Sequence, residues 1–249
     1  MTTYDRTGIG YAAVRRGDPR IAARVEAGLG EARSVLNVGA GTGSYEPPDR
    51  DVTAVEPSET MIAQRAPGSA PVVRASAERL PFDDDAFDAA MAMITIHHWD
   101  DLEAGLGEMR RVARERLVVL SFDPAPMREG FWFLDYFPRA LEIHAGLMPP
   151  LERVAAAMGG ARVETVPLPR RCSDGFFIAL WDRPEMHLDP GVRRGSTIWH
   201  EIEPEAAERG LAALRADLES GAWDERHGHL RDETEELDLG LRLLVAELD

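Results

Sequence analysis

The chain has 249 residues, of which 44% are hydrophobic, and its formal net charge is −16. This length is enough for one large α/β domain, or for a domain with a cap. A protein this acidic is a poor candidate for binding nucleic acid or an anionic membrane, so we expect neither as a partner. The single cysteine, Cys172, excludes an internal disulfide framework and suits a reducing compartment.

No stretch has the pattern of a membrane span or a secretory signal. The longest apolar run, residues 89–96, is too short to cross a bilayer. The first residues also lack the basic and then apolar pattern of a signal peptide. We therefore expect a cytoplasmic protein.

Strands and helices alternate along the first half of the chain. An amphipathic helix is predicted over 21–29, with Asp18 as its cap and Pro19 in its first turn. Alternation of strands and helices indicates a parallel sheet with helices on both faces. The strands are predicted at 34–38, 52–56, 71–74, 87–94 and 116–122, and the helices between them at 58–66, capped by Ser58, and 101–113.

The second half has a different character. Residues 125–150 are rich in aromatic side chains, which form either ordinary core or the wall of an apolar pocket. A helix at 151–158 and strands at 161–168 and 175–182 are predicted to complete the sheet, and 186–249 reads as mostly helical and acidic.

These elements predict one domain with a Rossmann-like α/β fold. We expect seven mostly parallel strands with helices on both faces, a helical lid and a C-terminal helical extension. The predicted domain covers residues 1–249, with a cofactor-binding core at about 30–124, a lid or acceptor region at about 125–160, and the C-terminal strands and extension at about 161–249.

The segment Val35-Leu-Asn-Val-Gly-Ala-Gly-Thr-Gly-Ser-Tyr45 reads as a buried strand that runs into a glycine-rich turn. Glycine tolerates positive φ and lets a ligand approach the backbone closely. Glu56 ends the next strand, 17 residues after Gly39, which is near the spacing at which a carboxylate binds a ribose diol. Together these features predict a cofactor of the adenosine type.

The spacing of the glycines helps to identify the predicted cofactor. A dinucleotide fingerprint needs a third glycine where this chain has Ser44, and no Gly-Lys-Ser/Thr of a phosphate-binding loop follows. A cofactor with a ribose and an adenine but no phosphate fits better. A nicotinamide-dependent oxidoreductase remains an alternative, as does a non-catalytic relative of the fold that binds only a cofactor or a partner.

Four segments in this order resemble the class I S-adenosylmethionine-dependent methyltransferases, in their small-molecule branch. The segments are 35–43, Ala54-Val-Glu-Pro-Ser58, the run Ala77-Glu-Arg-Leu-Pro-Phe-Asp-Asp-Asp-Ala-Phe-Asp88, and His97-His-Trp99. The resemblance covers about residues 34–123. It implies S-adenosylmethionine as cofactor and methyl transfer to an oxygen, nitrogen or carbon nucleophile of a small metabolite, by a monomer or homodimer.

The resemblance also implies which residues contact the cofactor. Glu56 would bind the ribose hydroxyls, and Ala77 and Glu78 would lie along the adenine. The chain departs from the family at Asn37 and Ser76, where acidic residues are common. The full implied set is Tyr11, Arg15, Asn37, Gly39, Ala40, Gly41, Gly43, Glu56, Pro57, Met61, Ser76, Ala77, Glu78 and Ile94.

His97 and His98 follow the fourth strand, where the methyl acceptor should lie. Methyl transfer from a sulfonium requires positioning and, for some acceptors, removal of a proton, and histidine is the natural base near neutral pH. We expect His97 to face the site, while a structural role for either histidine stays open. No zinc-binding spacing is present, so no metal is expected.

Overall fold

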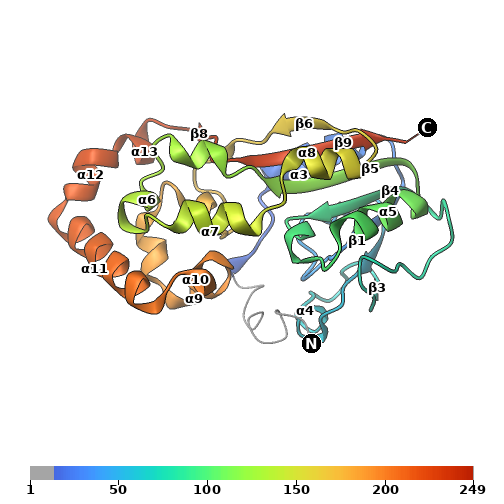
Figure 1. Cartoon of the computed structure of the whole chain (residues 1–249), viewed down its shortest axis with the longest axis horizontal. Helices are drawn as coiled ribbons and strands as arrows, with labels where there is room; N and C mark the ends of the chain where they lie inside the picture. The colour runs from blue at the N-terminus through green and yellow to red at the C-terminus, as the bar shows by residue number, and fades with distance from the viewer. Residues whose placement is uncertain (1–13, 249) are drawn as a thin grey trace.

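The structure, a computed structural model, describes residues 14–248, which form a twisted sheet with a helical cap at one end (Figure 1). The seven strands are ordered β3-β2-β1-β4-β5-β9-β6. β9 is antiparallel to both of its neighbours, and the other pairs are parallel. The strands are β1 (Ser34–Val38), β2 (Asp51–Val55), β3 (Val72–Val73), β4 (Phe87–Met93), β5 (Ala113–Phe122), β6 (Arg162–Thr165) and β9 (Leu241–Glu247). This confirms the predicted Rossmann-like fold.

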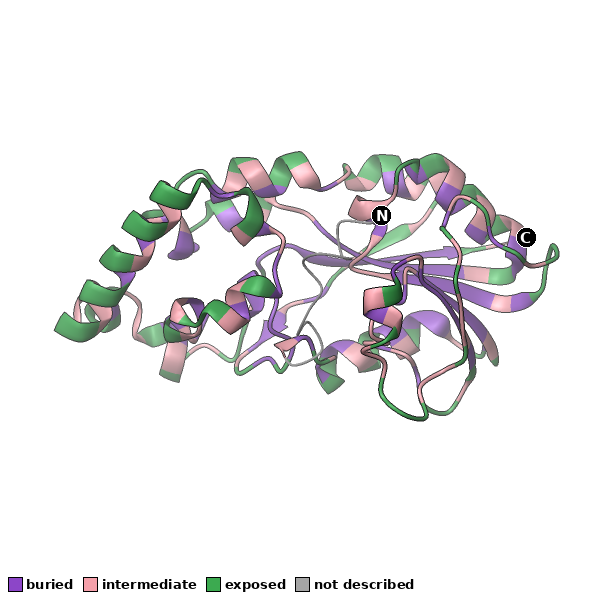
Figure 2. Cartoon of the chain, turned by 90° about the horizontal axis from the view of Figure 1, so that it is seen from below, coloured by how far each residue is buried: buried purple, intermediate pink, exposed green. Residues whose placement is uncertain are grey.

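Helices cover both faces of the sheet, because successive side chains of a strand point to opposite faces. α3 (Pro19–Leu29) packs on one face, and α5 (Leu102–Val112) and α8 (Leu151–Ala157) pack on the other. Neighbours such as Leu117 and Val118 are both fully buried, each in a different layer. In Figure 2 the strands are largely buried and the helices expose their outer faces.

The predicted helix caps are present. Asp18 caps α3 by accepting a hydrogen bond from the Arg20 amide, and Pro19 begins that helix. Ser58 accepts from the Met61 amide at the start of α4 (Glu59–Ile62), and Asp101 caps α5 in the same way. The caps of α4 and α5 fix where these helices begin after β2 and β4. They therefore also fix the ends of the loops at the carboxyl edge of the sheet.

One predicted strand is wrong. Residues 175–182 contain the 3₁₀ helix η3 (Phe177–Leu180), and the strand that completes the sheet is β9, from a region predicted to be helical. A short, continuous apolar run does not distinguish a strand from a buried helix. Residues 161–168 divide between β6 and β7 (Leu168–Pro169), which pairs with β8 (Glu236–Leu237) in a separate two-stranded sheet.

The cap consists of residues 124–150 and 168–240, which leave the sheet after β5 and β6. The aromatic residues Phe131, Trp132 and Phe133 are buried in its centre, so this part of the aromatic segment is core. The remaining cap elements are η2 (Ala125–Arg128), α6 (Phe133–Tyr136), α7 (Ala140–Leu147), η4 (Pro184–Leu188), α9 (Pro190–Arg194), α10 (Ile198–Glu201), α11 (Pro204–Ser220), α12 (Ala222–His227) and α13 (His229–Asp232).

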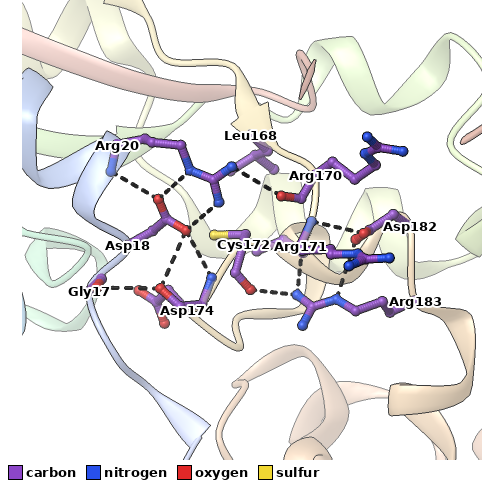
Figure 3. Close-up of polar contacts among 12 residues, drawn as sticks. Gly17, Asp18, Arg20, Leu168, Arg170, Arg171, Cys172, Asp174, Asp182 and Arg183 are labelled. Atoms are coloured by element: carbon purple, nitrogen blue, oxygen red, sulfur yellow. Dashed lines mark hydrogen bonds and ion pairs between the residues drawn. The ribbon is translucent and has the colours of Figure 1, made fainter. Parts of the chain in front are cut away.

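A polar network joins the start of α3 to the cap (Figure 3). The Asp18 carboxylate accepts hydrogen bonds from Arg20 and, at 2.9 Å, from the Ser173 amide of the cap. Arg20 also donates to the Arg170 carbonyl at 3.1 Å. Burial acts to raise the pKa of Asp18, but the hydrogen bonds from Arg20 and Ser173 together outweigh burial and lower it.

Among residues 14–248, no helix is both long enough and apolar enough to cross a membrane.

The junction between the cap and β9 gives a test of the fold. Gly240 has φ +99°, and a Cβ there would lie 1.8 Å from the Asp123 carbonyl oxygen. We expect Gly240→Ala to lower the free energy of unfolding by about 2–5 kcal/mol, the sum of a left-handed backbone and a forced displacement. Chemical denaturation measures this loss.

Gly221 supplies the matched control. It has φ +84°, and a Cβ there would have no atom of the described residues within 4 Å, apart from its own chain neighbours. Gly221→Ala should lower the free energy of unfolding only by the cost of the left-handed backbone, about 1–2 kcal/mol. Equal losses in the two variants would show that the Gly240 turn is not sterically constrained.

Candidate functional site

A cavity of about 360 Å³ lies at the carboxyl edge of the sheet. The loops that follow β1, β2, β3 and β4 line it, together with Arg15 from the segment before α3. This edge is where open parallel sheets bind their ligands. The predicted cofactor residues that line the cavity are Arg15, Gly39, Ala40, Gly41, Glu56, Pro57, Met61, Ser76, Ala77, Glu78 and Ile94.

The glycine-rich loop turns closely under the cavity. Gly39 has φ +68°, and a Cβ there would lie 2.3 Å from the Thr95 hydroxyl oxygen of the neighbouring loop. Gly41 has φ +54°, and a Cβ there would lie 3.2 Å from the Met61 methyl carbon. The positive φ favours glycine at both positions, and at Gly39 a side chain would also clash with Thr95, so the loop can lie this close to its neighbours at the cavity wall.

The Glu56 carboxylate lies at the cavity wall, and the residue is only 6% exposed. It accepts hydrogen bonds from the amides of Gly41 at 2.8 Å and Ser58 at 2.9 Å. A carboxylate offers about four acceptor positions, so holding these amides is compatible with binding the hydroxyl groups of a ligand. Glu56 therefore fixes the glycine loop and carries the chemistry needed for a ribose diol.

Asn37 and Gly43 do not line the cavity. Both lie against Glu46, which forms an ion pair with Arg65 at 2.8 Å beneath the loop. Asn37 donates to Glu46 at 3.1 Å, and a Cβ on Gly43 would lie 3.0 Å from the Glu46 carboxylate. These two residues, which were predicted to contact the cofactor, instead lie against the Glu46–Arg65 ion pair beneath the glycine loop. No sequence pattern predicted this ion pair.

Arg15 forms part of a buried polar cluster that the sequence did not predict. Its Nε donates to Asp174 of the cap at 2.5 Å, and the Tyr45 hydroxyl donates to the same carboxylate at 2.8 Å. Burial, and then the Asp174 charge, raise the pKa of Tyr45 well above its ordinary value. The other predicted N-terminal residue, Tyr11, lies outside the described residues.

The loops after β3 and β4 close the opposite wall. Ser76, Ala77 and Glu78 line the cavity, and the Glu78 carboxylate accepts from the Asp100 amide at 3.0 Å. This bond connects the two loops. The other lining residues lie outside the predicted set of cofactor residues and histidines: Thr42, Ser44, Tyr45, Met93, Thr95, Trp99 and Asp100.

The two adjacent histidines face different spaces. His98 lines the large cavity, whereas His97 lines a smaller cavity of about 40 Å³ between β4 and the cap. His144 of α7, which no sequence pattern connected to the site, lines the smaller cavity too. His98 therefore faces the larger of these two cavities, which is the candidate cofactor site. The sequence analysis had predicted that His97 would face the site.

Both predicted histidines favour the neutral form. Burial, followed by the charges of His98, His144 and Arg15, lowers the pKa of His97 well below its ordinary value. Burial and then Arg15 lower the pKa of His98 to about 4. Both rings are therefore neutral at neutral pH, which is the form that can accept a proton, while the lowered pKa also weakens each ring as a base.

The donor set of the large cavity fits a cofactor without phosphate groups. Arg15 is the only guanidinium among the described residues that line it, and that side chain is bound to Asp174. A pyrophosphate would call for more cations or a helix N-terminus directed at it. Within residues 14–248, no group of His, Cys, Asp and Glu side chains is arranged to hold a metal ion.

Comparison with known proteins identifies methyltransferases as relatives of this chain. A family model described as a methyltransferase domain matches residues 36–119. The crystal structure of a putative methyltransferase from an antibiotic biosynthesis pathway of Anabaena variabilis superposes with a TM-score of 0.86 and 30% identity, covering 94% of this chain and 99% of that one.

Curated relatives match over a shorter range. Demethylmenaquinone methyltransferase from Mycolicibacterium paratuberculosis is 35% identical over 129 residues, which is 49% of this chain and 56% of that protein. The enzyme of the same name from Thermus thermophilus is 33% identical, over 47% of this chain and 60% of that protein. The match thus spans a little over half the length of these relatives.

The comparisons give no support to an oxidoreductase or to a non-catalytic binding protein. The match to the Anabaena structure extends over nearly all of both chains, cap included, and the domain model covers the glycine loop and Glu56. The chain belongs to the class I S-adenosylmethionine-dependent methyltransferases.

Proposed function

We propose that the protein transfers the methyl group of S-adenosylmethionine to a nucleophilic atom of a small metabolite. The observation that carries this proposal is the position of Glu56, whose buried carboxylate holds the glycine loop at the wall of a cavity at the carboxyl edge of the sheet. The relatives named above are methyltransferases, which supports the same reaction.

The chain's residues divide into those that bind the cofactor and those that face the acceptor. Gly39 and Gly41 would carry the methionine and ribose portion, and Glu56 would accept hydrogen bonds from the two ribose hydroxyls. Ala77 and Glu78 would lie along the adenine. The end of β4, at Ile94, would then lie beside the transferred methyl group.

The bound cofactor supplies an electrophilic methyl group on a sulfonium. The protein's part is to hold the acceptor in line with that methyl group and, where the acceptor carries a proton, to remove it. His97 and His98 lie directly after β4, and their rings are 3.8 Å apart. Their lowered pKa values keep them neutral, which is the form that accepts a proton.

Other properties follow as parts of the proposal. The acidic chain and its single cysteine favour a cytoplasmic enzyme that acts on a small molecule rather than on nucleic acid or a membrane. We infer a monomer or homodimer.

Substitution of Glu56 tests the cofactor assignment. Glu56→Ala should weaken S-adenosylmethionine binding by about 1.5–3 kcal/mol, the usual range for hydrogen bonds to a charged group. Glu59→Ala is the matched control, because Glu59 lies three residues away with its side chain 73% exposed and paired with Arg74. Calorimetric titration should give wild-type affinity for the control only; an unchanged affinity in Glu56→Ala would refute the ribose assignment.

Removal of the proposed base tests the chemistry. His97→Ala should lower turnover about 10²–10⁴-fold while cofactor affinity is kept. Because the pKa of His97 is lowered, the wild-type rate should hold as the pH falls to 6.5 and decline only below that value.

The control for this experiment is His229→Ala, which changes an exposed histidine of the cap. His98→Ala, measured in parallel, shows which ring accepts the proton. A small effect of both His97→Ala and His98→Ala would mean that positioning alone carries the reaction. A rate that already falls above pH 6.5 would contradict the neutral histidine.

A further inference from the structure

The smaller cavity adjoins the proposed cofactor site. Arg15 and Ile94 line both cavities, so these two side chains form the boundary between them. Ile94 follows β4 directly and has φ +54°, which is a strained conformation for a β-branched residue. Such strain clusters at functional sites, and here it directs a side chain to the point where the two spaces meet.

Two buried polar atoms in this cavity have no hydrogen-bond partner among the described residues. They are Nε2 of His144, which is 3% exposed, and the hydroxyl oxygen of Ser196, which is 7% exposed. A buried polar atom without a partner is costly, so such atoms are rare in folded proteins. Both residues belong to the cap, and both would be satisfied by a polar group of a bound ligand.

The rest of the lining is apolar and aromatic. Phe122 and Phe177 contact the His144 ring edge-on, with ring centroids 5.3 Å and 5.1 Å away. Phe176 completes this aromatic wall. Aromatic side chains favour flat, unsaturated partners, which they contact by offset stacking or edge-to-face packing.

The charges of the cavity disfavour a cationic ligand. No carboxylate is present among the described residues that line it, whereas Arg15 is. Burial lowers the pKa of His144 to about 4, and burial followed by the charges of His98, His144 and Arg15 lowers the pKa of His97 as well. Arg15 is paired with Asp174, so an ammonium group would find two neutral rings and no carboxylate among the described lining residues, while a hydroxyl group can both donate to an imidazole and accept from Ser196.

We propose that this cavity is the methyl-acceptor subsite, and that it takes the acidic hydroxyl group of a phenol or enol, held by His144 and Ser196 beside His97. This inference rests on the proposed function, which places the methyl donor in the adjoining cavity. A volume of about 40 Å³ holds the reacting group and not a ring, so the cap must yield as the acceptor enters.

The chemistry balances with the groups present. The proton of the acceptor hydroxyl passes to a ring nitrogen of His97. An electron pair of the acceptor oxygen forms the new bond to the methyl carbon. The bond between that carbon and sulfur breaks, and its electron pair stays on sulfur, which becomes a neutral thioether. The imidazolium of His97 then releases its proton to solvent.

The test compares two probes. Phenol has a hydroxyl group that can lose its proton, whereas benzylamine carries a positive charge at neutral pH. Protein labelled with ¹⁵N-histidine is first titrated with S-adenosylhomocysteine and then, at saturation, with each probe. We expect phenol to shift the His97 and His144 imidazole signals and benzylamine to leave them in place. His144→Leu and Ser196→Ala should each raise the dissociation constant for phenol about two- to tenfold, because each removes one hydrogen bond.

Controls separate this inference from the proposed function. His200→Ala changes an exposed histidine of α10 and should bind phenol as the wild type does. Normal binding of S-adenosylhomocysteine with no imidazole response to phenol, or with an equal response to benzylamine, overturns the acceptor subsite alone. Failure of wild-type protein to bind S-adenosylhomocysteine overturns the proposed function itself.

Discussion

The arrangement of the site depends on the buried carboxylate of Asp174. This side chain is fully buried and binds Arg15, from the segment before α3, and Tyr45, from the glycine-rich loop. A buried charge is tolerated only when it is paired and hydrogen-bonded, so the three segments are tied to one geometry. The cap, the N-terminal segment and the cofactor loop therefore meet at one point, and Arg15 becomes the boundary between two cavities.

The same constraint places two adjoining cavities at one edge of the sheet. The large cavity is made by loops that follow strands of the sheet, and the small cavity is closed by the cap. The chain forms the cap by leaving the sheet after β5 and β6 and returning through β9. In the proposed function, the loops of the sheet form the cofactor cradle and the cap forms the acceptor wall.

The sequence predicts the features that depend on local patterns, and it does not predict those that depend on contacts between residues far apart in the chain. Gly39, Glu56 and Ser58 were predictable because a strand, a turn and a cap are local patterns. Asp174, His144 and Ser196 were not, because they reach the site only through the packing of the cap. β9 was missed for the same reason, since its partners β5 and β6 lie far away in the chain.

The most direct test of the account is calorimetric titration of the wild-type protein, stripped of copurified ligand, with S-adenosylmethionine, S-adenosylhomocysteine and NADH in parallel. The cavity has a buried carboxylate at its wall and a single guanidinium among its described lining residues, so we predict binding of the first two, with micromolar dissociation constants, and none of NADH. Binding of NADH alone, or of none of the three, would contradict the central claim that this cavity holds a phosphate-free adenosyl cofactor.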